Sequence, residues 1–149
     1  MRPTASETVC IFIEIILFHW DFMRLNGEVV SGMGEGKKFF LLEHYSRRFE
    51  KFLGGLPFAG TLNVDVGRNN GEKTRGVREN AQIKIEGFEY AGKKYFDVVC
   101  VRAKVAGVEG LIIFPHLNHH PPNILEFVCK EDMRLAHGLK NGDTVEIEF

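Results

Sequence analysis

The sequence contains little cysteine, and the few thiols it has are poorly placed for a shared site. The 3 cysteines are Cys10, Cys100 and Cys129, and no two of them form a CxxC pair. A zinc ribbon or a thioredoxin motif needs such a pair, so neither is supported. Isolated thiols among apolar neighbours are usually buried small hydrophobic side chains. We therefore expect a reducing, cytoplasmic location.

An excess of charge of one sign is also missing. The 19 basic and 20 acidic residues leave a formal net charge of −1. Nucleic-acid-binding domains usually present a clearly basic surface, so we expect no nucleic-acid partner.

Long hydrophobic runs are absent as well. The most apolar stretch, residues 10–20, is interrupted by Glu14, and a membrane-spanning helix needs about 20 apolar residues. No small-residue cleavage site follows this stretch, so it does not resemble a secretory signal, and we expect no membrane partner. Residues 1–22 either pack on the domain as an extra strand or helix, or precede a translation start at Met23. We favour the Met23 start, which makes residues 23–149 the domain.

What the chain does contain is many short segments that favour strands, separated by turns. These segments are residues 25–31, 38–42, 61–66, 82–90, 94–105, 109–114, 124–128 and 144–149. Only two helices are expected, at residues 43–53 and 131–137, and residues 67–80 are expected to form a surface loop. The pattern predicts one mainly β domain with a barrel architecture rather than a doubly wound sheet.

A glycine-rich stretch lies between the first two expected strands. It comprises Ser31, Gly32, Met33, Gly34, Glu35, Gly36, Lys37 and Lys38. Alternate glycines let backbone N–H groups approach a phosphate closely, and the lysines add positive charge. The spacing fits neither a P-loop nor a dinucleotide fingerprint. A flexible hairpin turn is therefore the alternative to a phosphate-binding loop.

Three further residues carry side-chain oxygen atoms that could bind a metal ion or accept a proton. Thr61 and Asn63 point to the same side of an expected strand, because strand side chains alternate. Their hydroxyl and amide oxygens suit Mg²⁺, although solvent-facing polar residues give the same pattern. Glu126 lies among apolar neighbours, where a carboxylate can act as a general base. Its alternative is a place on the wet face of an edge strand.

Two other groups offer weaker signals. His116, His119 and His120 suggest a metal site, but no thiolate or carboxylate at a recognisable ligand spacing completes one. Residues 130–134 begin the second expected helix, whose N-terminal N–H groups, with Lys130 and Arg134, could hold an anion or read a base edge. Otherwise Glu131 and Asp132 merely favour the start of the helix.

Taken together, these segments resemble the CTP-dependent riboflavin kinases of archaea. The resemblance covers nearly all of residues 25–149, and it rests mainly on the run Gly27 to Gly36 and on the tetrad Gly60-Thr61-Leu62-Asn63. Further matches are residues 92–96, Pro115, His120, residues 124–126, Arg134 and residues 139–143. The departures are Asn118, where the family often has a hydroxyl residue, and Pro121-Pro122.

The resemblance implies a six-stranded cradle-loop barrel that converts riboflavin and CTP to FMN and CDP. Mg²⁺ would be held by Thr61 and Asn63, Glu126 would be the catalytic base, and Asn118 and Glu126 would contact the flavin. The nucleotide-binding residues implied are Gly32, Met33, Gly34, Glu35, Gly36, Lys37, Lys38, Glu131, Asp132, Met133 and Arg134. We expect a monomer. The alternatives are a DNA-binding regulator on a related swapped-hairpin barrel and a flavin or nucleotide sensor without turnover.

Overall fold

A computed structural model of the chain describes residues 23–32, 43–115 and 121–149. Within these ranges the strands are β1 (Arg24–Val30), β2 (Leu62–Asp65), β3 (Ile83–Ile85), β4 (Phe88–Tyr90), β5 (Lys93–Tyr95), β6 (Val98–Val105), β7 (Val108–Pro115), β8 (Ile124–Val128) and β9 (Thr144–Glu148). The helices are α3 (Glu43–Leu53), the 3₁₀ turn η1 (Arg68–Asn70), α4 (Gly71–Glu79) and α5 (Met133–Ala136). The strand expected at residues 38–42 lies outside the described residues.

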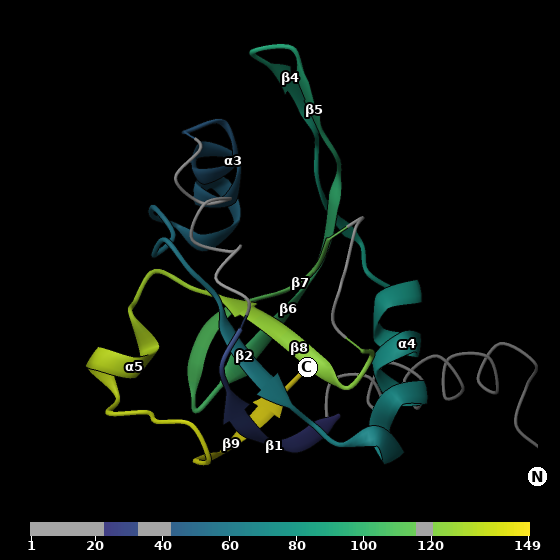
Figure 1. The fold of residues 1–149 in the computed structure, drawn as a ribbon, viewed down its shortest axis with the longest axis vertical. Helices are drawn as coiled ribbons and strands as arrows, with labels where there is room; N and C mark the ends of the chain where they lie inside the picture. Colours follow the sequence, from purple (N-terminus) through teal and green to yellow (C-terminus); the bar gives the residue numbers. More distant parts are fainter. Residues whose placement is uncertain (1–22, 33–42, 116–120) are drawn as a thin grey trace, which may run out of the picture.

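Six of these strands form a closed antiparallel barrel (Figure 1). Their order is β6-β7-β8-β2-β1-β9, and pairing of β6 with β9 closes the ring. The short strand β3 pairs with the outer part of β6, while β4 and β5 form a separate hairpin that extends away from the barrel. The prediction of a mainly β, six-stranded barrel is confirmed.

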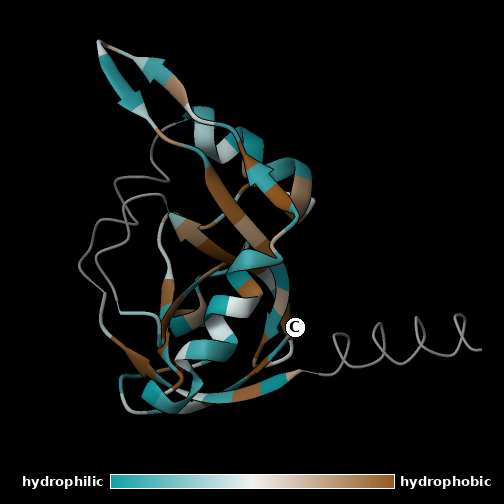
Figure 2. Ribbon diagram, turned by 90° about the vertical axis from the view of Figure 1, so that its right-hand side faces the viewer, coloured by the Kyte–Doolittle hydropathy of each residue, from teal (hydrophilic) through white to brown (hydrophobic). Residues whose placement is uncertain are grey.

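The barrel interior is filled by apolar side chains from alternate positions of each strand. On β1, Leu25 and Val29 are buried, and on β9 so are Val145 and Ile147. Since neighbouring strand residues face opposite sides, each strand places one apolar row inside. Figure 2 shows the apolar residues concentrated along the barrel strands, whereas the β4–β5 hairpin is largely hydrophilic.

A second apolar cluster joins α3 to the outside of the barrel. Tyr45 and Phe49, one turn apart on α3, are fully buried against residues of β3, β6 and β7. The Tyr45 hydroxyl donates to the carbonyl oxygen of Phe96 at 2.6 Å, and burial raises the pKa of Tyr45 to about 12. Helix α3 is thereby fixed beside the hairpin. The helix ends at Leu53, directly before Gly54, which has a positive φ of 72°.

Two described cysteines behave as the sequence predicts. Cys100 and Cys129 are free and buried, and burial raises the pKa of the Cys100 thiol to about 12. A thiol with so high a pKa is almost entirely protonated at neutral pH and is therefore a poor nucleophile.

The expectation of a loop at residues 67–80 is wrong. These residues form η1 and α4, so the described part of the chain has three α-helices rather than two. The helix buries Thr74 and Val77, which lie three positions apart on one face. The Thr74 hydroxyl oxygen lies 2.8 Å from the Pro122 carbonyl oxygen and so ties the helix to the segment before β8. The other residues of this segment are mostly glycine or charged, so the sequence shows no clear apolar helical pattern here.

Helix α4 leads to a direct prediction. A Cβ added at Gly76 would meet no atom within 4 Å. A helix is less stable with glycine than with alanine at an interior position. We therefore expect Gly76→Ala to raise the free energy of unfolding by about 0.5–1 kcal/mol. Urea unfolding measures this change. A loss of stability would contradict the helical assignment.

Candidate functional site

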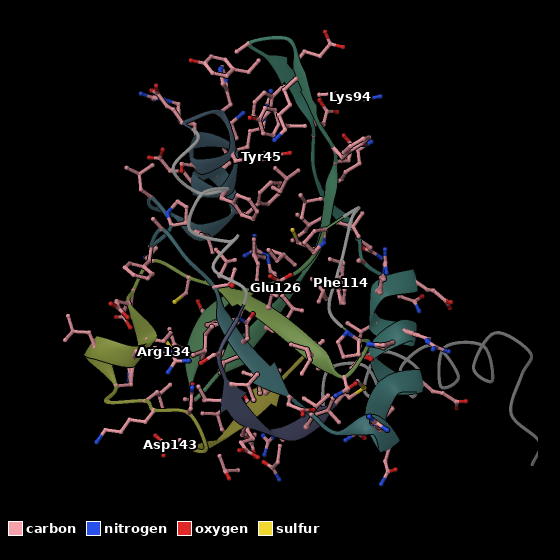
Figure 3. All side chains as sticks on the ribbon, in the orientation of Figure 1. Tyr45, Lys94, Phe114, Glu126, Arg134 and Asp143 are labelled. Atoms are coloured by element: carbon pink, nitrogen blue, oxygen red, sulfur yellow. The ribbon has the colours of Figure 1, made fainter. Side chains whose placement is uncertain are left out.

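Asn63 and Glu126 lie directly opposite each other on neighbouring strands. The register of β2 and β8 pairs Asn63 with Glu126, and side chains in such a pair share one face of the sheet, with Cβ atoms about 4.5–5.5 Å apart. Figure 3 shows Glu126 where β8 passes beside β2. Since β8 lies between β7 and β2, the edge-strand alternative for Glu126 is wrong, and the residue is half-buried.

The Asn63 side chain is buried rather than facing solvent. Only 4% of the residue is exposed, so the solvent-facing alternative does not hold for it. One reason is Gly32, where an added Cβ would lie 1.9 Å from Asn63 Nδ2. The end of β1 also pairs with this position, through Val30 opposite Asn63. The first glycine of the glycine-rich stretch therefore lies directly against Asn63.

This contact predicts the effect of a methyl group at position 32. We expect Gly32→Ala to displace the Asn63 amide and to lower the free energy of unfolding by about 1–3 kcal/mol. Denaturant unfolding and the NMR signals of the Asn63 side-chain NH₂ measure the two effects. Unchanged Asn63 signals would show that the two residues are not in contact, and Gly76→Ala is the control.

Thr61 supplies a second oxygen atom beside Asn63. The Thr61 hydroxyl donates to Asn63 Oδ1 at 3.4 Å, so the two oxygen atoms lie next to each other. Nowhere in residues 23–32, 43–115 and 121–149 do three His, Cys, Asp or Glu side chains form a group able to hold a metal. A hydroxyl and an amide oxygen fit a hard cation that takes its other ligands from water and phosphate, as Mg²⁺ does.

Residues 131–134, the other segment expected to bind nucleotide, lie close to Thr61. An open depression of about 310 Å³, including the space at its mouth, runs beside Thr61. Its lining comprises Phe58, Gly60, Thr61, Leu62, Phe127, Cys129, Glu131, Asp132, Met133 and Arg134. The structure thus brings the Thr61 segment together with residues 131–134.

Helix α5 is shorter than expected, and its N-terminus is already capped. The helix begins at Met133, and the Asp132 carboxylate accepts from the Leu135 N–H at 3.2 Å. The interpretation that N-terminal N–H groups hold an anion therefore fails for the Leu135 N–H, while the alternative that Asp132 favours the helix start is confirmed. Glu131 lies 2.9 Å from the His137 ring nitrogen, and Met133 is buried.

Several predicted residues lie outside the described ranges, and one residue of the lining was not predicted. Residues 33–38 and Asn118 lie outside the described residues, as do His116, His119 and His120. Phe58, which is 41% exposed, forms part of the lining, although it lies in none of the segments singled out from the sequence. An aromatic residue three positions before Thr61 is the signal that could have found it.

No helix within the described ranges is both long and apolar enough to cross a membrane.

The chain is similar to one protein family and to several curated proteins. The family model whose short name abbreviates CTP-dependent riboflavin kinase, with the description "Domain of unknown function DUF120", matches residues 29–149. Identity to a riboflavin kinase of Ignicoccus hospitalis is 42% over 125 residues, covering 84% of this chain and 70% of the relative. For a riboflavin kinase of Pyrobaculum arsenaticum it is 40% over 126 residues, covering 85% and 60%.

A riboflavin kinase of Pyrobaculum islandicum is 36% identical over 151 residues, which cover 100% of this chain and 72% of the relative. The chain therefore spans 60% to 72% of the length of these three relatives.

Proposed function

The chain belongs to the family of CTP-dependent riboflavin kinase domains, and from this premise we propose that it phosphorylates riboflavin. The reaction transfers the γ-phosphoryl group of CTP to the 5′-hydroxyl of riboflavin. The oxygen of that hydroxyl forms the new bond to phosphorus, the bond to the β,γ-bridging oxygen breaks, and FMN and CDP leave. The buried free thiols of Cys100 and Cys129 support a reducing compartment, and we propose the cytoplasm.

The observation that carries the proposal is the pairing of Asn63 with Glu126, with Gly32 against Asn63. Phosphoryl transfer depends mainly on positioning and on neutralising charge. The buried amide of β2, the half-buried carboxylate of β8 and the first glycine of the glycine-rich stretch, just after β1, come together here. This arrangement supports a site at which a phosphate chain and an acceptor hydroxyl meet.

Glu126 is the proposed general base. Its carboxylate would accept the proton of the riboflavin 5′-hydroxyl as the oxygen attacks phosphorus. The position on β8 supports this role, because the strand is held on both sides by β7 and β2 and therefore fixes the carboxylate. Asn118 and Glu126 together are the proposed flavin contacts.

The proposed nucleotide contacts come from two segments. The phosphate contacts are Gly32, Met33, Gly34, Glu35, Gly36, Lys37 and Lys38. Those at the cytosine end are Glu131, Asp132, Met133 and Arg134, supported by their place along the depression beside Thr61. Base selection by shape would occur there, because the lining combines apolar Phe58 and Met133 with polar groups.

Thr61 and Asn63 are the proposed ligands of Mg²⁺. Their oxygens lie on one side, 3.4 Å apart, and suit this hard cation in kind. When bound with CTP, the ion would neutralise charge on the phosphates. Burial of Asn63 keeps its amide in one orientation, so this side chain needs little reordering on binding.

A donor comparison tests the proposal. Purified protein is incubated with riboflavin, MgCl₂ and either CTP or ATP, and FMN is separated by chromatography. We expect FMN with CTP and little with ATP. Absence of FMN with both nucleotides would refute kinase activity, while equal rates with both would refute the CTP preference. Omission of Mg²⁺ is the matched control, and FMN formation should then stop.

A further inference from the structure

Three segments of the chain meet where the glycine-rich stretch begins. Arg134 Nη2 donates to the Val30 carbonyl oxygen at 3.2 Å and to Asn141 Oδ1 at 2.8 Å. Asn141 Nδ2 in turn donates to Ser31 Oγ at 2.6 Å. These contacts join β1, α5 and the segment before β9, which Figure 3 shows on one side of the barrel through the labels Arg134 and Asp143.

The backbone around Asn141 is fixed independently of these side-chain contacts. Gly142 N donates to Val29 O at 2.9 Å, and Val29 N donates to Asp143 O at 2.9 Å. Asp143 Oδ2 accepts from Lys140 N at 2.8 Å and so closes the turn. Asn141 is therefore held on a tight turn beside β1, and its amide is preorganised between two partners.

Arg134 has further N–H donors, beyond those used by Val30 and Asn141, that a ligand could use. An arginine side chain has five N–H groups, and the two on Nη2 suffice for Val30 and Asn141. The groups on Nε and Nη1 are left over from these two contacts. Both acceptors are neutral, so they orient the guanidinium without cancelling its positive charge. The same side chain lines the depression beside Thr61.

We propose that Asn141 is a positioning residue for the nucleotide. Its amide oxygen orients Arg134 and its amide nitrogen holds Ser31, so one side chain sets the spacing between the two nucleotide-binding segments. Gly32, next to Ser31, lies against Asn63, and a shift of Ser31 would reach the proposed metal ligands as well. This inference rests on the proposed function, because it assumes that both segments bind one nucleotide.

The test compares Asn141→Ala with Asn141→Asp. We expect Asn141→Ala to raise the KM for CTP and the Kd for CDP about tenfold, because two hydrogen bonds that orient the site are lost. The KM for riboflavin and kcat should stay within about twofold. Asn141→Asp keeps one oxygen for Arg134 and another that can accept from the Ser31 hydroxyl. It should restore most of the CDP affinity.

The matched control is Asn80→Ala, which removes an exposed amide bonded at 2.8 Å to Gly76 O, at the end of α4. CDP binding by calorimetry is measured for all four proteins. Equal Kd values for the Ala variants at positions 141 and 80 would overturn the inference, as would a kcat that falls in step with stability. Absence of FMN from the wild type with unimpaired CDP binding would refute the kinase alone, because calorimetry tests Asn141 without turnover.

Discussion

Glu126→Gln is expected to lower kcat for FMN formation by about 10²–10⁴-fold, which is the usual contribution of a general base. Glutamine keeps the shape of the side chain but cannot accept the proton of the riboflavin hydroxyl. The affinity for riboflavin should be largely kept, because the amide still offers a hydrogen-bonding oxygen. Steady-state kinetics with saturating CTP and a titration with riboflavin measure the two quantities separately.

The control for this variant is Glu109→Gln on β7. Glu109 is exposed and pairs with Lys104 at the far end of the β6–β7 ladder from Glu126. It tests whether the loss of one negative charge alone changes the rate. A kcat within about twofold of wild type in Glu126→Gln would remove this residue as the base. Urea unfolding of both variants checks that a lower rate does not reflect lost stability.

Asn63→Ala should have the second largest effect, on Mg²⁺-dependent nucleotide binding. The variant removes one of two oxygens proposed for the cation and opens space beside Gly32, whose backbone packs on the Asn63 amide. We expect the Kd for CDP in the presence of Mg²⁺ to rise at least about tenfold. Without Mg²⁺, wild type and variant should bind CDP with similar, weaker affinity.

Calorimetry with and without Mg²⁺ separates the metal from the packing effect. If Asn63→Ala weakens CDP binding equally in both conditions, Asn63 supports the loop but does not hold the cation. Asn26→Ala, at an exposed position on β1, is the control for loss of an amide. Its Kd values should equal those of wild type in both conditions.

The barrel could be predicted because each strand has a recognisable local pattern of apolar and polar residues. Leu62, Val64 and Val66 alternate with polar residues, and all three are buried as that pattern predicts. The residue types at Thr61, Asn63 and Glu126 also indicated oxygen chemistry. Their proximity was not predictable from alternation, because the pairing of β2 with β8 joins residues about sixty positions apart, and such register depends on the whole sheet.

Other features were hidden for different physical reasons. Helix α4 buries only Thr74 and Val77, so its apolar face is too small to stand out among glycine and charge. The contact between Asn141 and Ser31 spans 110 positions, and an Asn-Gly pair in a sequence indicates a turn and nothing about what the amide touches. Helix α4 and the Asn141–Ser31 contact both depend on packing against segments that are distant in the sequence.

The central claim is that Gly32, Asn63 and Glu126 surround one nucleotide–metal complex. The most direct measurement replaces Mg²⁺ by paramagnetic Mn²⁺ in the presence of CDP and records the backbone amide NMR signals. Signals of residues 32, 61–63 and 126 should broaden first, while those of α4 stay sharp. Strongest broadening around α4 or the β4–β5 hairpin, with sharp signals at Asn63, would contradict the account.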